Sequence, residues 1–88
     1  AVDYLKTEQD CAEYLSVVLE DGDPTLLAAA LGDVARARGM SQVARDSGLT
    51  REGLYKALST QGNPSFATVM KVMHAMGLQI SVQPVAHA

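Results

Sequence analysis

Apolar residues recur every three to four positions over most of the chain, a spacing that predicts amphipathic helices. The first predicted helix follows a capping-box pattern over residues 7–10 and runs to about Glu20. The second begins with Asp23 as its N-cap and Pro24 in the first helical position, and Gly39 ends it. The inner faces are expected to consist of Cys11, Leu15, Val18 and Leu19 in the first helix, and of Leu27, Leu31, Val34 and Ala35 in the second.

Two shorter helices are predicted over residues 41–47 and 51–58, joined by the turn 48–50, with Thr50 as the cap of the later helix. Two short helices across a tight turn are typical of a helix-turn-helix unit, which we place at residues 40–59. The side chains expected to close the angle between them are small or apolar: Ala44, Gly48 (a glycine suited to positive φ) and Leu54, with Val43 and Leu49 beside them.

A fifth helix is predicted after the loop-like stretch 59–64, with Ser65 as its cap and Gly77 at its end. Its expected apolar face consists of Phe66, Val69, Met70, Met73 and Met76. Over residues 78–83 apolar and polar side chains alternate, which predicts one half-buried β-strand.

A lone strand must pair its backbone groups with something. We therefore expect an antiparallel partner strand in a two-fold related copy, with a flexible tail as the alternative. The predicted fold class is all-α, a single five-helix DNA-binding domain over residues 1–88 with one short C-terminal strand that pairs across a dimer. The dimer interface is expected to contain Leu78, Ile80, Val82 and Met73.

The later helix of the helix-turn-helix unit carries the candidate DNA-reading side chains on its outward side. Because a recognition helix docks its N-terminal part in the major groove, Thr50, Arg51 and Glu52 are expected nearest the base edges. An arginine can pair bidentately with guanine, and a glutamate can accept from cytosine. Further contacts to bases or phosphates are expected from Tyr55 and Lys56, and contacts to the DNA backbone from Ser41, Gln42 and Arg45.

Two of these residues have alternative interpretations. Tyr55 could pack on the next helix, and Glu52 could form a local ion pair with Lys56 at spacing i, i+4. Gly53 lies inside the predicted recognition helix, where it costs up to about 1 kcal/mol relative to alanine. It therefore indicates a close backbone approach to DNA or to a neighbour.

Charge is divided unevenly along the chain, whose net charge is −3. Residues 1–33 hold eight acidic residues against one lysine, whereas residues 34–88 hold six basic residues against two acidic ones. The acidic residues 1–33 and the basic residues 34–88 are therefore expected to contact different partners or each other. The alternative is that both are simply solvated surfaces.

Several classes of protein are not expected from this sequence. A single cysteine, Cys11, gives no internal disulfide, and with His74 and His87 it has no metal-ligand spacing. No phosphate loop, paired-carboxylate site or Ser/His/Asp set is visible, so we expect no enzyme, no cofactor and no metal. No membrane-spanning run or signal peptide is visible, which favours a cytoplasmic protein.

The chain resembles the HigA-like "probable addiction module antidote" antitoxins, a branch of the lambda-repressor-like helix-turn-helix proteins, over about nine-tenths of its length. The matching stretches are residues 4–7, 19–24, 28–33, 35–42, 48–58 and 62–66. The resemblance implies an antitoxin that neutralises a small RelE/ParE-like toxin and, as a dimer, binds operator DNA to repress its own operon. A basic toxin would suit the acidic residues 1–33. In the broader helix-turn-helix superfamily a glutamine usually opens the first helix of the motif, where this chain has Met40.

Three interpretations of function remain open at this point. The first is a DNA-binding antitoxin. The second is a repressor of the same fold without a toxin, and the third is a protein-only adaptor that has lost DNA binding. Arg45, Arg51 and Lys56 on one unit favour DNA binding over the adaptor, and the identity of the adjacent gene would separate the first two.

Overall fold

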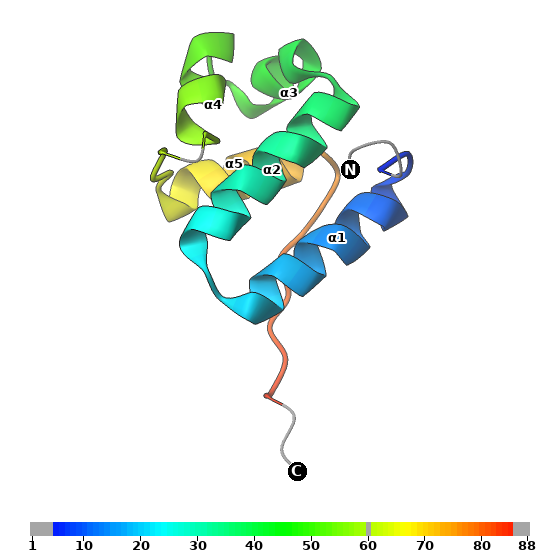
Figure 1. Cartoon of the computed structure of the whole chain (residues 1–88). Helices are drawn as coiled ribbons and strands as arrows, with labels where there is room; N and C mark the ends of the chain where they lie inside the picture. The colour runs from blue at the N-terminus through cyan, green and yellow to red at the C-terminus, as the bar shows by residue number, and fades with distance from the viewer. Residues whose placement is uncertain (1–4, 60, 86–88) are drawn as a thin grey trace.

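Five α-helices make up the regular structure of the chain in a computed structural model that describes residues 5–59 and 61–85 (Figure 1). The all-α prediction is therefore confirmed. The predicted helix boundaries agree with the observed ones to within about two residues. The helices are α1 (Glu8–Asp21), α2 (Pro24–Arg38), α3 (Met40–Ser47), α4 (Arg51–Ala57) and α5 (Phe66–Ala75).

Side-chain caps determine where four of the helices begin, because the first backbone amides of a helix have no partner within it. At α1 the Thr7 hydroxyl accepts from the Asp10 amide at 3.0 Å, and the Asp10 carboxylate accepts from the Thr7 amide at 3.2 Å. The Asp23, Thr50 and Ser65 side chains cap α2, α4 and α5 in the same way. All four caps are those predicted from the sequence.

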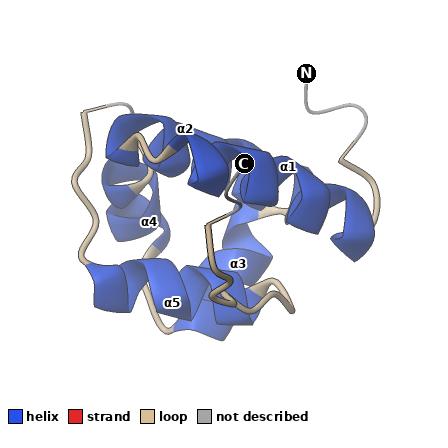
Figure 2. Cartoon of the chain, turned by 90° about the horizontal axis from the view of Figure 1, so that it is seen from below, coloured by secondary structure: helices blue, strands red, loops and turns tan. Residues whose placement is uncertain are grey.

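The helices are arranged around α3, which packs against α2, α4 and α5, while α1 packs along α2 (Figures 1 and 2). Their inner faces form one hydrophobic cluster in which Leu31, Val34 and Leu54 are completely buried. The cluster draws on every helix and on Leu5 before α1. The predicted inner face of α2 is confirmed, but Leu19 of α1 is 40% exposed.

The predicted inner face of α5 is wrong at two positions. Phe66 is 68% exposed and Met70 is 50% exposed, whereas Val72, which was not expected inside, is completely buried. The buried stripe of α5 is Val69, Val72, Met73 and Met76, with spacing i, i+3, i+4, i+7. Because this stripe is narrow, the neighbouring i, i+4 pair Phe66 and Met70 falls outside it.

The predicted strand is not formed in the described part of the chain, where residues 78–85 have no regular secondary structure (Figure 2). A strand is defined by hydrogen bonds to a neighbouring strand, and residues 79–85 make no such backbone bond within the described chain. Leu78 and Ile80 nevertheless pack against the core while Gln79 and Ser81 are exposed, so the alternation of burial is present without the pairing. Within the described ranges, no helix has the length and apolar character to cross a membrane.

Candidate nucleic-acid interface

The angle between α3 and α4 is closed by the small and apolar residues predicted for it. Val43, Ala44 and Leu54 are buried, at 2%, 5% and 0% exposure. Gly48 ends α3 with a φ of 77°, a left-handed conformation that favours glycine. The next amide, that of Leu49, donates to the Ala44 carbonyl at 3.0 Å, and the Leu49 side chain packs against the core. This turn leaves the outer sides of both helices open to solvent.

All eight residues predicted to contact DNA are exposed, and all lie on α3, on α4 or in the turn between them. Three come from α3, one caps α4, and four belong to α4 itself: Ser41, Gln42 and Arg45; Thr50; and Arg51, Glu52, Tyr55 and Lys56.

The Arg51 guanidinium lies over the ring of Tyr55, with its central carbon 5.6 Å from the ring centroid. It also donates a hydrogen bond of 3.4 Å to the Tyr55 hydroxyl. Tyr55 is 40% exposed and does not belong to the buried core. The pair confines the Arg51 side chain to the outer side of α4.

A second polar group on α3 includes a residue that the sequence analysis missed. The Gln42 side-chain nitrogen donates to both carboxylate oxygens of Asp46, at 3.0 and 2.9 Å, and its oxygen accepts from Arg45 at 3.3 Å. The i, i+4 spacing of Gln42 and Asp46 was the signal that could have revealed this pairing. It fixes the orientation of the Gln42 amide, with its oxygen toward Arg45.

Gly53 takes part in the cap of its own helix. A Cβ atom at Gly53 would lie 2.9 Å from the Thr50 hydroxyl, which accepts from the Gly53 amide. The neighbour that approaches closely is therefore Thr50. The alternative pairing of Glu52 with Lys56 is absent from the ion pairs of the described residues. Met40, which stands where the broader superfamily usually has a glutamine, is buried in the core.

The acidic residues of α1 and α2 are largely occupied in local structure. Glu8 pairs with Arg38 at 3.4 Å, joining the start of α1 to the end of α2. Asp33 accepts from the Tyr14 hydroxyl at 3.0 Å and lies 3.6 Å from Arg36. In the described part of the chain the side chains of Glu20 and Asp21 make no hydrogen bond or ion pair. The acidic charge with no structural role is thus concentrated at the end of α1.

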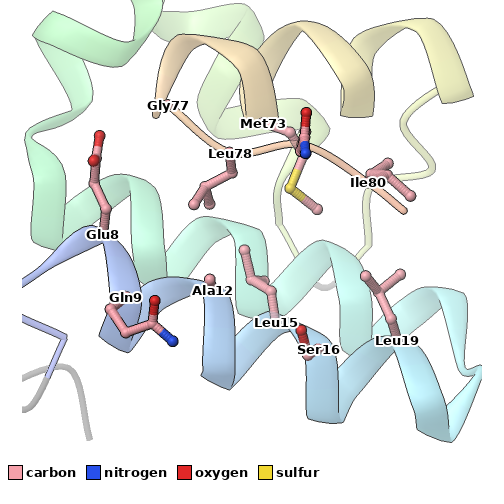
Figure 3. Close-up of a pocket in the computed structure, with 11 residues that line it drawn as sticks. Glu8, Gln9, Ala12, Leu15, Ser16, Leu19, Met73, Gly77, Leu78 and Ile80 are labelled. Atoms are coloured by element: carbon pink, nitrogen blue, oxygen red, sulfur yellow. The ribbon is translucent and has the colours of Figure 1, made fainter. Parts of the chain in front are cut away.

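The four residues predicted for a dimer interface differ in exposure. Val82 is 93% exposed, and Leu78 and Ile80 are partly buried, whereas Met73 is 3% exposed and belongs to the core of its own chain. Met73, Leu78 and Ile80 line a groove with residues of α1 (Figure 3).

Cys11 is completely buried, as predicted. Burial raises the pKa of its thiol above the ordinary value of 9.0, and the nearby Arg38 guanidinium opposes this shift only in part. No group of three or more metal-ligating side chains occurs among the residues that the structure describes.

Sequence comparisons identify the family of the chain. Residues 1–84 match the family described as "Probable addiction module antidote protein". The chain belongs to this antidote family. An uncharacterized protein of Haemophilus influenzae is 57% identical to it over 81 residues, which cover 92% of this chain and 84% of that protein. No solved structure matches the chain. Antidote proteins are antitoxins, typically without enzymatic activity, and membership of the family implies a toxin partner.

Proposed function

We propose that this chain is the antitoxin of a type II toxin–antitoxin module, and that as a dimer it binds operator DNA through a lambda-repressor-like helix-turn-helix unit formed by α3 and α4. In this proposal it acts in the cytoplasm, neutralises a RelE/ParE-like toxin and represses its own operon. The observation that carries the DNA-binding part is the exposed polar side of α4, where Arg51 stacks on Tyr55 beside Lys56.

The charge distribution supports this assignment over a protein-only adaptor. Helices α3 and α4 carry three basic side chains, Arg45, Arg51 and Lys56. Arg38 lies nearby in sequence, at the end of α2. Arg45 and Lys56 have no ion pair in the described structure, so their charge is available to phosphates. The negative net charge of the chain comes from residues 1–33, which belong mostly to α1 and α2.

The contacts are proposed to divide into base reading and backbone positioning. Thr50, Arg51 and Glu52 stand at the N-terminal end of α4, the part of a recognition helix that lies nearest the bases. Arg45 and Gln42 are proposed to contact phosphates, with Ser41 at the start of α3. Arg51 is the proposed guanine-reading residue, because its guanidinium can donate two parallel hydrogen bonds.

The DNA-binding part is tested with the DNA upstream of the chain's own gene. The protein should protect a two-fold symmetric site whose half-sites are about one helical turn, ~34 Å, apart. Arg51→Ala should weaken operator binding by about 1–3 kcal/mol and relax the preference at one base pair. Lys6→Ala, an equal loss of charge at an exposed residue before α1, is the matched control and should change operator affinity little. Equal losses on operator and random DNA would make Arg51 a phosphate contact, and an unchanged operator affinity would contradict the assignment.

The antitoxin part is tested separately with the product of the gene beside this one. Co-expression of the chain should restore growth to cells that produce a toxic neighbouring protein, and the two proteins should co-purify. A chain that binds its operator but has no toxic neighbour and captures none would instead be a repressor without a toxin, which is the second candidate function.

A further inference from the structure

A groove of about 280 Å³ runs between α1 and the segment that follows α5 (Figure 3). Leu15 and Leu19 point into it from α1, and residues 77–80 form the opposite wall. Met73, Leu78 and Ile80 complete an apolar lining in which Glu8 is the charged side chain. Leu19, which the helical pattern placed inside the protein, is 40% exposed here. The groove therefore leaves apolar surface of the described chain in contact with solvent.

The segment beyond the groove wall is an uncharged, apolar extension. Val82 is 93% exposed and Val85 is 75% exposed. No backbone–backbone or side-chain hydrogen bond is recorded for residues 79–85 in the described part of the chain. Residues 78–88 contain no aspartate, glutamate, lysine or arginine. An extended segment with free amides and carbonyls and alternate apolar side chains is suited to pairing with another strand.

We propose that the groove of each chain receives residues 82–85 of a second copy, so that α1 forms part of the dimer interface. This inference rests on the dimer of the proposed function and specifies its geometry. In an antiparallel pair with the two-fold axis beside Ser81, residue 82 of one copy lies opposite residue 80 of the other, and residue 83 lies opposite residue 79. Residues directly opposite each other share one face of the pair, so Val82 of the second copy lies beside Ile80 and over the groove.

The occupant is a second copy because the groove and the extension belong to one continuous stretch of chain. Residues 77–80 form the wall of the groove and residues 81–85 leave the body of the molecule directly after it (Figure 1). Each copy therefore offers one groove and one extension, which is the reciprocal arrangement that closes a two-fold dimer. The uncharged extension also fits a groove whose lining is mainly apolar.

The test compares two lysine substitutions two residues apart on α1, on different sides of the helix, in the full chain. Leu19→Lys places a charge in the groove, whereas Val17→Lys adds the same charge at a residue that is 67% exposed and does not line it. Sedimentation equilibrium should show the dimer dissociation constant raised at least about tenfold by Leu19→Lys, and changed less than about twofold by Val17→Lys. Circular dichroism establishes that both variants retain the helical content of the parent.

A cross-link tests the same geometry without adding charge. In the double variant Leu19→Cys, Val82→Cys, oxidation should give disulfide-linked dimers on a non-reducing gel, with reduced yield in either single variant.

The inference is overturned if Leu19→Lys leaves the dimer intact, if both lysine variants weaken it equally, or if the new disulfide closes within one chain. A parent that is monomeric throughout would overturn the dimer of the proposed function as well. If Ile80→Pro disrupts the dimer and Leu19→Lys does not, the paired strands form the interface and α1 is excluded from it.

Discussion

Gly32 of α2 lies directly against the backbone carbonyl of Leu58, the residue that ends α4. A Cβ atom at Gly32 would stand 2.8 Å from that oxygen and 3.6 Å from the Leu58 Cβ. The missing side chain therefore allows the end of α4 to approach α2 closely. Since α4 carries the proposed DNA-reading residues, this contact helps to determine how they are presented.

Gly32→Ala is expected to destabilise the protein, although alanine is the better helix former. The gain in helix propensity is at most about 1 kcal/mol, and forcing a methyl group into a filled space costs about 1–3 kcal/mol. We expect a net loss of up to about 2 kcal/mol in the free energy of unfolding, measured by urea denaturation. A more stable variant would show that Leu58 moves away at little cost.

Thr50→Ala should also lower stability, because the Thr50 hydroxyl accepts from the Gly53 amide at 2.9 Å and caps α4. Loss of such a cap costs about 0.5–2 kcal/mol. Thr50→Ser is the matched control, since serine keeps the accepting hydroxyl. Equal urea midpoints for the alanine and serine variants would indicate that the cap does not stabilise α4.

Sequence periodicity predicted the five helices well because their caps and glycine ends are local signals. It also predicted that the DNA-binding candidates are exposed, because polar side chains on the outer side of a short helix would lose their hydration if they were buried. It failed where packing between distant segments decides the outcome. The exposure of Phe66 and Met70, and the contact of Gly32 with Leu58, depend on how α5 and α4 meet the remaining helices. The predicted strand failed for a related reason, because pairing requires a second strand that the described chain lacks.

Tyr55 is expected to act on DNA binding partly through Arg51. Tyr55→Phe keeps the ring below the guanidinium and removes the hydroxyl contact of 3.4 Å, whereas Tyr55→Ala removes both. An exposed cation–π contact contributes about 0.5–1 kcal/mol, so Tyr55→Ala should weaken operator binding severalfold and Tyr55→Phe less. Fluorescence anisotropy measures the operator affinity of Tyr55→Ala, of Arg51→Ala and of the double variant, which together with the parent form a double-mutant cycle. Additive losses would mean that the two side chains act independently.

The stability of the protein should fall at alkaline pH through Cys11. Burial raises the pKa of this thiol in the folded protein above its ordinary value of 9.0. Above that ordinary value the unfolded chain loses the thiol proton while the folded chain keeps it, so unfolding becomes more favourable as pH rises toward the folded pKa. Urea midpoints between about pH 8 and 10 should decrease more steeply in the parent than in Cys11→Ala. Parallel pH profiles for the two proteins would exclude this contribution.

We propose that the exposed acidic residues of α1 form the landing surface for a basic toxin, and reversal of their charge tests that idea. Glu8 is unsuitable for the test because its ion pair with Arg38 joins two helices, whereas Glu13, Glu20 and Asp21 are exposed and outside any ion pair of the described residues. Changing these three to lysine should slow toxin association markedly at low salt, because opposite potentials steer encounter. At physiological ionic strength the effect should shrink, since screening acts beyond about 8 Å.

A graded series separates steering from structural damage. The neutral variant Glu13→Gln, Glu20→Gln, Asp21→Asn should give an association rate between those of the parent and the lysine variant when measured by stopped-flow fluorescence. Operator binding by the antitoxin alone should be kept or slightly strengthened in both variants, because the removed charges repel DNA phosphates. Dissociation rates should change little, since exposed charges at the rim of an interface act mainly on association. Association rates that are the same for all three proteins at low salt would show that the toxin lands elsewhere and that these acids are simply a solvated surface.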